Sequence, residues 1–263
     1  MLKNKIRVLT LKLLLPRGRQ YQHEAGIEVR WNKYFVKSGE KNLCVLQRSV
    51  LDSAKGIIIL SHSYLAEAKK FYLTRGHAQM YLDQGFEVVI FDFNGFGESP
   101  FVDFDYCGDL TAVADFIQKS NPGKPVFGHG VSFGASHTIT YGTAADNVFQ
   151  RIIIENCLDS NLSYYRKRNI KLHFMMLSLM KIFPAVNKDH NYINGIKNLK
   201  NIKRALFIYN TDDDLTTIKM GEQLCEACNV TASMEIFSGQ HLQAFQKNPD
   251  KYTEKVISFL LNI

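Results

Sequence analysis

Short, strongly apolar runs recur along this chain, and longer segments with helical signals separate them. Strands that are buried on both faces read as continuous apolar runs, and they occur in parallel sheets whose faces are covered by helices. Two such runs, residues 56–60 and 86–91, are predicted as buried strands, and residues 125–129, 151–155 and 205–210 are predicted as further strands. Their alternation with helices predicts an α/β fold with a mostly parallel, doubly wound sheet.

Further elements complete this pattern. Residues 26–36 and 42–47 are two strands joined by a Gly-containing turn, which predicts a leading β-hairpin. With residues 233–237 as a last strand, the sheet has about eight strands. Helices are predicted over residues 67–84, 109–119, from the turn after residue 129 to about 143, and over 216–228 and 249–261.

The length of 263 residues suits one α/β domain with an insertion. No stretch approaches the ~20 apolar residues that span a bilayer, and no secretory signal is recognisable. The five cysteines are odd in number and scattered, which favours a reducing compartment, so we expect a cytoplasmic protein. Cys225 and Cys228 form a Cys-x-x-Cys pair, but no second pair completes a zinc site. Gly95 and Gly97 do not complete a dinucleotide fingerprint. No metal or cofactor is therefore expected.

The net charge of +7 is unevenly distributed. Residues 1–20 carry six Lys or Arg and no acidic residue, and residues 156–203 carry nine basic and two acidic residues. Both segments are also rich in Leu, Ile, Met and Phe. They could face an anionic membrane, meet an anionic substrate head or form a solvated face, and these alternatives stay open. Aromatic residues are not interleaved with the charges, which argues against nucleic acid as a partner.

The strongest functional signal is Gly130-Val131-Ser132-Phe133-Gly134, between a predicted strand and a predicted helix. This pattern is typical of a nucleophile elbow, in which the serine has a strained backbone and needs small residues two positions before and after it. Gly130 and Gly134 occupy those positions. The N-terminus of the following helix favours negative charge that develops beside it. The sequence therefore predicts Ser132 as a catalytic nucleophile.

On this motif and two others, the chain resembles the α/β-hydrolase superfamily from about residue 26 to residue 263. Leu60-Ser61-His62-Ser63-Tyr64 stands where the family commonly has His-Gly-x. Residues 91–99, Phe-Asp-Phe-Asn-Gly-Phe-Gly-Glu-Ser, are similar to the family's Asp-x-Arg-Gly-x-Gly-x-Ser segment. Within the superfamily, the chain looks like the serine esterase, lysophospholipase and thioesterase branches. The resemblance implies an α/β-hydrolase fold with an inserted helical lid and a Ser-His-Asp triad.

The resemblance also selects the acid and the histidine. The acid should follow the strand that ends at Asn210, where three candidates stand in a row, Asp212, Asp213 and Asp214. In the family it usually stands three positions after a glycine that ends the strand, and Asn210 takes that glycine's place, which favours Asp213. The histidine should lie in a loop beyond the next strand, where His241 is found. The order Ser, Asp, His is the one expected for this fold.

Two backbone N–H groups should form the oxyanion hole. The resemblance assigns one to Phe133, which follows the nucleophile. It assigns the other to Ser63 or Tyr64 in the loop after the first long strand, and Tyr64 is preferred. His62 in the same loop is expected to shape the loop and to contact the substrate.

Residues 156–203 are too long for a plain connection, and they fall where this fold commonly inserts a lid. Their central run, residues 172–183, is rich in Leu, Met and Phe and ends at Pro184. Methionines give a deformable apolar wall that suits a flexible chain. Met175, Met176 and Leu179 are therefore predicted to bind an acyl group. The alternative is that this helix simply packs onto the domain.

The chain is thus divided into a hydrolase domain, residues 26–263, and a basic N-terminal segment, residues 1–25. In that segment Leu2, Ile6, Leu9 and Leu13 recur at helical spacing, which favours an amphipathic helix at a membrane surface. The protein is then expected in the cytoplasm, with a peripheral membrane location as the alternative.

Together these residues predict a serine hydrolase that cleaves a small-molecule carboxylic ester or thioester with an apolar acyl group, through an acyl-enzyme intermediate. Lipid metabolism is the expected setting. The same triad would serve an acyltransferase or a peptidase. A third hypothesis is a hydrolase-fold protein that binds lipids or membranes without catalysis. Such proteins usually lose a triad member, whereas this sequence has a candidate for each.

Overall fold

The computed structural model describes residues 30–50, 53–182 and 191–262. The predicted N-terminal segment 1–25 and Pro184 lie outside the described residues. The described residues form two compact units, one up to Lys124 and the other from Pro125 onward. Among the described residues, no helix combines the length and the apolar character that a membrane span needs.

The first unit holds four strands in the order β1-β2-β4-β3. Its strands are β1 (Asn32–Ser38), β2 (Lys41–Arg48), β3 (Ile57–Ser61) and β4 (Glu87–Phe91), and its helices are α2 (Lys70–Thr74), α3 (His77–Asp83) and α4 (Tyr106–Ser120). The first two strands pair as the predicted antiparallel hairpin, and β3 and β4 pair in parallel. Every residue of β3 and β4 is buried, in agreement with their continuous apolar sequences.

One predicted element of this unit differs in the structure. The single helix expected over residues 67–84 is two short helices, α2 and α3. Gly76 separates them with φ +86°, a left-handed conformation that ends the first helix. The apolar periodicity of residues 67–84 does not reveal this break, because a single glycine lowers helix propensity without excluding a helix.

The second unit holds four strands that all pair in parallel, in the order β5-β6-β7-β8. Its strands are β5 (Val126–Val131), β6 (Phe149–Glu155), β7 (Arg204–Asn210) and β8 (Thr231–Phe237). Its helices are α5 (Phe133–Gly142), α6 (Asn161–Arg168), α7 (Ile170–Ile182), α9 (Tyr192–Ile196), α10 (Ile218–Ala227), α11 (Ala244–Lys247) and α12 (Pro249–Leu261). The described strands thus number eight and are mostly parallel, as the sequence predicts.

The parallel register of the second unit positions the candidate site. β5, β6 and β7 end at Val131, Glu155 and Asn210, and in a parallel sheet these carboxyl ends lie along the same edge. Ser132 donates its backbone N–H to Glu155 at 2.8 Å, and Asn156 donates its own to Ile208 at 2.9 Å. These bonds continue the ladder just past the strands, so the residues that follow each strand are brought together.

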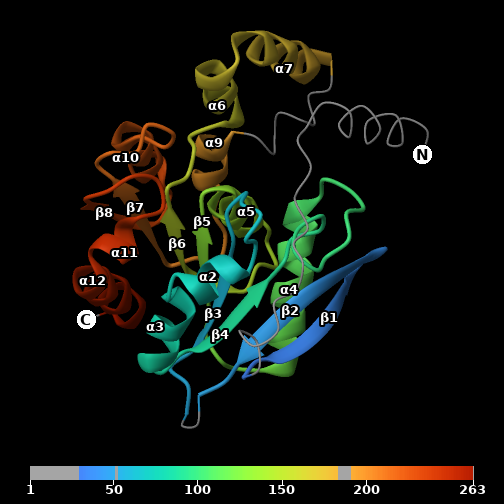
Figure 1. Cartoon of the computed structure of the whole chain (residues 1–263), viewed down its shortest axis with the longest axis vertical. Coiled ribbons are helices and arrows are strands. Elements are labelled where there is room, and N and C mark those ends of the chain that lie inside the picture. Colours follow the sequence, from blue (N-terminus) through green and yellow to red (C-terminus); the bar gives the residue numbers. More distant parts are fainter. Residues whose placement is uncertain (1–29, 51–52, 183–190, 263) are drawn as a thin grey trace. The chain divides into compact units, whose positions relative to one another are not determined.

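The long predicted insertion contains α6, α7 and α9 among its described residues. Figure 1 shows α9 nearest the strands of this unit, α6 beyond it and α7 farthest out. α6 begins with a serine cap, in which Ser160 accepts a hydrogen bond from the Ser163 backbone N–H. Met176 and Met180 of α7 are buried, whereas the side chain of Leu179 lies outside the description.

Candidate active site

Ser132 stands in a sharp turn between β5 and α5. Its backbone has φ 51° and ψ −111°, a sparsely populated conformation for a residue with a side chain. A Cβ atom on Gly130 would lie 2.5 Å from the Thr138 hydroxyl and 2.6 Å from the Ala135 Cα, so only glycine fits there. Strain of this kind costs about 1–3 kcal/mol and is found where a function requires it. The turn leaves the Ser132 side chain half-buried at the start of α5.

The structure brings His241 to this serine. The Nε2 atom of His241 lies 3.1 Å from the Oγ atom of Ser132, and its Nδ1 atom lies 2.6 Å from the Oδ2 atom of Asp213. A neutral imidazole that donates from Nδ1 to the carboxylate leaves the Nε2 lone pair facing the hydroxyl. The three side chains come from separate loops and form the contact sequence of a Ser-His-Asp triad.

The three neighbouring aspartates differ in how far their side chains are buried. Asp213 is buried and contacts His241, whereas Asp212 and Asp214 are exposed. The Oδ1 atom of Asp213 accepts hydrogen bonds from the backbone N–H groups of Leu215, at 2.8 Å, and Thr216, at 2.9 Å. Burial alone would raise the pKa of Asp213, but the hydrogen bond and charge of His241 and the donors of Thr216 outweigh it and hold the pKa below its ordinary value.

Two residues that the sequence analysis did not single out complete the surroundings of the acid. Asn156 donates from Nδ2 to Asp213 Oδ2 at 2.9 Å, and its Oδ1 accepts the Leu242 backbone N–H at 3.4 Å. Thr216 donates its hydroxyl to the same Oδ2 atom, and this hydroxyl lies 3.3 Å from His241 Nδ1. Both residues are fully buried. Asn156 thus links the loop that carries the acid to the loop that carries the histidine.

A local signal exists for each of these residues. Thr216 stands three positions after Asp213, the spacing at which a hydroxyl reaches back to a preceding carboxylate in a turn. Asn156 follows β6 directly and has φ 49°, a conformation that asparagine tolerates better than most residues. Neither signal specifies the target atom, since that depends on the register of β6 and β7.

The residues predicted for the oxyanion hole belong to different units. Phe133 is the first residue of α5, and its ring packs edge-on against His137 with centroids 4.4 Å apart. Tyr64 follows β3, and its ring packs edge-on against Phe96 with centroids 5.0 Å apart. Both assignments remain predictions.

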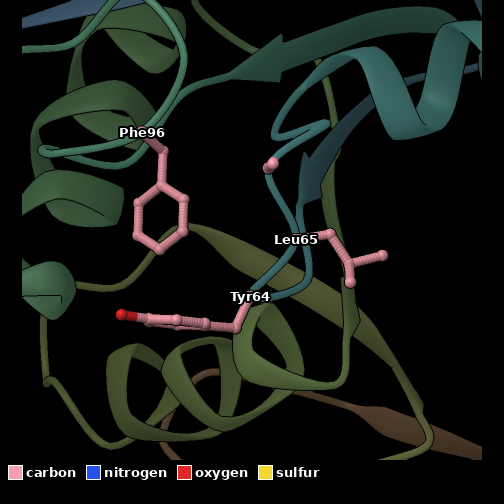
Figure 2. Close-up of a pocket in the computed structure, with 4 residues that line it drawn as sticks. Tyr64, Leu65 and Phe96 are labelled. Atoms are coloured by element: carbon pink, nitrogen blue, oxygen red, sulfur yellow. The ribbon is translucent and has the colours of Figure 1, made fainter. Parts of the chain in front are cut away.

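A cavity of 280 Å³ lies in the first unit beside this loop, lined by Tyr64, Leu65, Ala66 and Phe96. In Figure 2 the rings of Tyr64 and Phe96 border the same open space. The lining is apolar and aromatic apart from the tyrosine hydroxyl, the kind of surface that suits an apolar ligand portion.

His62 has a structural role in the same loop. It is fully buried, its Nδ1 donates to the Ser63 carbonyl at 2.7 Å, and its Nε2 accepts the Phe93 N–H at 3.1 Å. Burial lowers the pKa of His62 to about 4, so the ring is neutral at physiological pH. The contacts engage both ring nitrogens and leave the ring no exposed surface. The loop-shaping role and the substrate contact of His62 both remain predictions.

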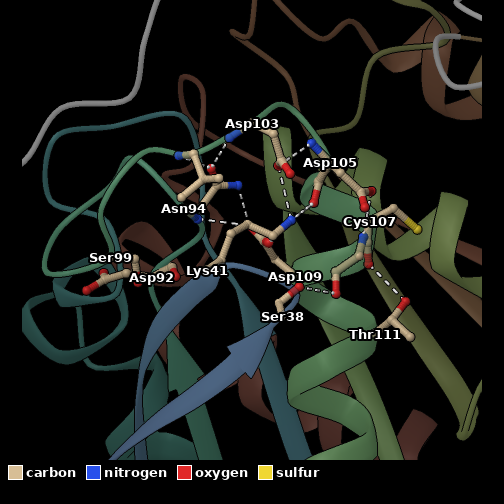
Figure 3. Close-up of polar contacts among 12 residues, drawn as sticks. Ser38, Lys41, Asp92, Asn94, Ser99, Asp103, Asp105, Cys107, Asp109 and Thr111 are labelled. Atoms are coloured by element: carbon tan, nitrogen blue, oxygen red, sulfur yellow. Dashed lines mark hydrogen bonds and ion pairs between the residues drawn. The ribbon is translucent and has the colours of Figure 1, made fainter. Parts of the chain in front are cut away.

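The segment similar to Asp-x-Arg-Gly-x-Gly-x-Ser forms a polar network in the first unit. Asn94, which replaces the arginine of the pattern, donates from its backbone N–H and its Nδ2 to Asp109 Oδ2, at 2.9 and 2.7 Å. Asp109 also pairs with Lys41 at 2.8 Å. Figure 3 shows the Lys41 ammonium among Asp103, Asp105 and Asp109. These contacts tie the hairpin to α4, so the network supports the fold.

Asp92 of the same segment belongs to a buried ion cluster. Lys69, which is fully buried, binds Asp92 at 2.7 Å and Glu98 at 2.8 Å. Cys44, Asp92 and Glu98 have ligand-type atoms within 4.8 Å of one another, a spacing that would suit a metal ion. The Lys69 ammonium already binds both carboxylates, and burial raises the pKa of the Cys44 thiol to about 12, which disfavours the thiolate that binds metals. The residues therefore fit a lysine-centred cluster better than a metal site.

The fold and the elbow define the chain as an α/β hydrolase. The model of the serine aminopeptidase S33 family matches residues 52–186, slightly more than half of the chain. The chain belongs to this family. The matched residues include Ser132, whereas Asp213 and His241 lie beyond them.

Solved structures show the same fold at low sequence identity. The esterase Pf2001 of Pyrococcus furiosus has a TM-score of 0.74 and 17% identity, over 94% of this chain and 97% of that chain. The enol-lactonase of Burkholderia xenovorans LB400 has a TM-score of 0.64 and 17% identity, over 88% and 100%. The proline iminopeptidase of Mycobacterium smegmatis has a TM-score of 0.63 and 14% identity, over 88% and 98%. No curated protein matches the chain.

Proposed function

We propose that this hydrolase is a serine esterase that cleaves a carboxylic ester or thioester with an apolar acyl group. One observation carries the proposal: His241 lies 3.1 Å from the Ser132 hydroxyl and 2.6 Å from the Asp213 carboxylate. These distances lie within the range at which a base accepts a proton and a carboxylate orients that base. The structural likeness to esterase Pf2001 agrees with this chemistry.

The proposed reaction has two halves. In the first, Ser132 Oγ attacks the acyl carbonyl while His241 Nε2 takes the hydroxyl proton, and Asp213 stabilises the resulting imidazolium. The tetrahedral intermediate then expels the alcohol or thiol, which receives that proton, and an acyl-serine remains. In the second half, water gives a proton to His241 and attacks the acyl-serine. Collapse of this second intermediate releases the acid and restores the Ser132 hydroxyl.

In this proposal the backbone N–H groups of Phe133 and Tyr64 bind the oxyanion, and residues 156–203 act as a lid. Met175 and Leu179 then form part of the wall that contacts the acyl chain. The half-buried position of Met175 supports this role. Met176, which is also predicted to bind the acyl group, is almost completely buried, so in this proposal it supports the wall from behind. Loss of one oxyanion donor typically costs about 2.7–4 kcal/mol of transition-state stabilisation.

A peptidase is the second candidate. The family description, serine aminopeptidase, and the structural likeness to a proline iminopeptidase favour it. Both candidates use the same triad, because ester and amide cleavage share the tetrahedral intermediate. They differ in the leaving group that His241 must protonate.

A substrate panel tests the proposal. We expect purified protein to hydrolyse p-nitrophenyl esters and thioesters, with kcat/KM rising with the acyl chain over the shorter members, and to leave aminoacyl p-nitroanilides almost untouched. Ser132→Ala protein is the control for background hydrolysis. Fast cleavage of the anilides with slow cleavage of the esters would favour the peptidase. Turnover of no member by the wild-type chain would refute a hydrolytic function.

The compartment and the N-terminal segment remain proposals. All five cysteines are free thiols, which supports a reducing compartment such as the cytoplasm. For residues 1–25, we propose contact with an anionic membrane surface. Deletion of residues 1–20 should then weaken binding to anionic vesicles at low salt, and unchanged binding would remove this role without affecting the catalytic proposal.

A further inference from the structure

The helix α7 has two faces of different character. Met176 and Met180 are 1% and 7% exposed and lie one turn apart on its inner face. Ile170, Phe174 and Ile182 are 53%, 61% and 67% exposed. Their spacing of four and eight residues places them along one side of the helix, opposite the methionines. Three large apolar side chains are therefore presented to water by one helix of 13 residues.

The charges around this apolar row have one sign. Residues 161–182, which form α6 and α7, contain no Asp or Glu and five exposed basic residues, Arg166, Lys167, Arg168, Lys171 and Lys181. Helical geometry places Lys171 and Lys181 on the same side of α7 as the exposed apolar residues. Lys167 donates to the Asp214 carbonyl at 3.0 Å, which fixes the basic end of α6. Figure 1 shows α7 as the described helix of this unit that lies farthest from its strands.

We propose that the outer face of α7, formed by Ile170, Lys171, Phe174, Lys181 and Ile182, docks on an anionic phospholipid bilayer. A helix that lies in a membrane interface buries one apolar side among acyl chains and keeps Lys or Arg at the headgroups. Long lysine stems suit this position, because the methylenes cover apolar surface while the ammonium stays at the phosphates.

The same composition disfavours a protein partner. Lysine is depleted from protein–protein interfaces, whereas here two lysines are interleaved with the apolar residues. Purely electrostatic binding to an acidic protein would not require the exposed Ile170, Phe174 and Ile182. The proposal does not depend on the esterase proposal, since a bilayer would bind this face whether or not Ser132 is a nucleophile.

Vesicle binding by the full chain tests the proposal. We expect binding to vesicles of phosphatidylcholine and phosphatidylglycerol that weakens with salt and is much weaker on phosphatidylcholine alone. Lys171→Gln with Lys181→Gln should weaken binding by about 25-fold, at about fivefold for each lysine. Phe174→Ser should weaken it by about tenfold or more. Residues 1–25 stay intact in every variant, so each loss is assigned to α7.

A matched control exists in the first unit. Phe35 of β1 is also 61% exposed, and Lys37 and Lys119 are exposed lysines. Phe35→Ser, Lys37→Gln and Lys119→Gln remove the same side chains from surfaces that the proposal does not use, and vesicle binding should be unchanged. All variants should unfold at the same temperature as the wild type, which shows that each one is folded. Equal vesicle binding by the α7 variants and the wild type would overturn the proposal.

Depth of insertion gives a second readout. The chain has one tryptophan, Trp31, so Trp31→Phe with Phe174→Trp places a single reporter on α7. We expect its emission to shift to the blue on anionic vesicles and to be quenched by lipids with brominated acyl chains. Vesicle binding without quenching would contradict insertion of α7. Equal binding of the wild type and the Phe174→Ser variant to an immobilised acidic protein would also contradict the proposal.

Discussion

Two buried carboxylates, one in each unit, show how similar surroundings serve different purposes. Asp92 accepts hydrogen bonds from the backbone and the ammonium of Lys69 and from the Glu98 backbone, and Asp213 accepts them from Leu215, Thr216, Asn156 and His241. Both are therefore held by several donors. The difference lies in what each carboxylate orients.

In the Asp92 cluster the charged groups neutralise one another. Lys69 is fully buried and its ammonium forms ion pairs with two carboxylates, which stabilise its charged form. Asp213 instead orients an imidazole that is about a quarter exposed and that faces the half-buried hydroxyl of Ser132. An imidazole nitrogen can accept a proton from a hydroxyl and return it, whereas the Lys69 ammonium is already bound to two carboxylates. The number of hydrogen bonds that a buried carboxylate accepts therefore does not identify an active site. A partner that can exchange a proton with a nucleophile does.

The largest expected effect is that of Ser132→Ala. Removal of the nucleophile should lower kcat for the best ester by about 10⁴–10⁶-fold. Alanine keeps a Cβ in the strained turn, so thermal unfolding should change little. Rates that stay within tenfold of the wild type would exclude Ser132 as the nucleophile.

Asp213→Asn should lower kcat by about 10⁴-fold, because the amide no longer orients and stabilises the imidazolium. Asp212→Asn and Asp214→Asn are matched controls, since both neighbours are exposed and the carboxylate that contacts His241 belongs to Asp213. Steady-state kinetics of the three variants should single out one position. A comparable loss in either control would contradict the assignment of the acid.

Asn156→Gly should lower kcat by about tenfold with little change in KM, because it removes one donor to Asp213 and one acceptor of Leu242. Glycine tolerates the positive φ of this position, so the backbone can stay as it is. Asn156→Asp keeps the shape but adds a like charge, which should raise the pKa of Asp213 and shift the acid limb of the pH–rate profile upward. Wild-type kinetics and pH profile in both variants would show that Asn156 has no positioning role.

Glu98→Gln should leave catalysis unchanged and affect stability. Burial opposes ionisation of Glu98, but Lys33 and Lys69 outweigh it and lower its pKa from 4.5 to about 2. A lowered pKa in the folded state stabilises the fold above the ordinary value, and this contribution is lost as pH falls from 4.5 towards 2. The variant should lose about 1 kcal/mol at pH 7, less than the full shift implies because solvent screens this partly exposed carboxylate, and the difference should shrink below pH 4.5. Chemical denaturation at several pH values measures this, with Glu40→Gln at an exposed position as the control.

The sequence predicts the fold class well, because buried parallel strands are continuous apolar runs and each has a turn signal after it. It places Ser132 in its turn, since the steric demand for Gly130 is local. It does not predict the break at Gly76, which depends on how α2 and α3 pack. It also does not predict the contacts of Asn156 and Thr216, or the burial of His62, because these depend on the register of strands and on loops far apart in the sequence.

The most direct test of the account is the site of labelling by a fluorophosphonate, which reacts with serines that are activated by a neighbouring base. We predict one adduct per chain, located on Ser132 by peptide mass spectrometry, and strongly slowed labelling in the His241→Gln variant. A wild-type chain that forms no adduct, or a His241→Gln chain that is labelled as fast as the wild type, would contradict activation of Ser132 by His241.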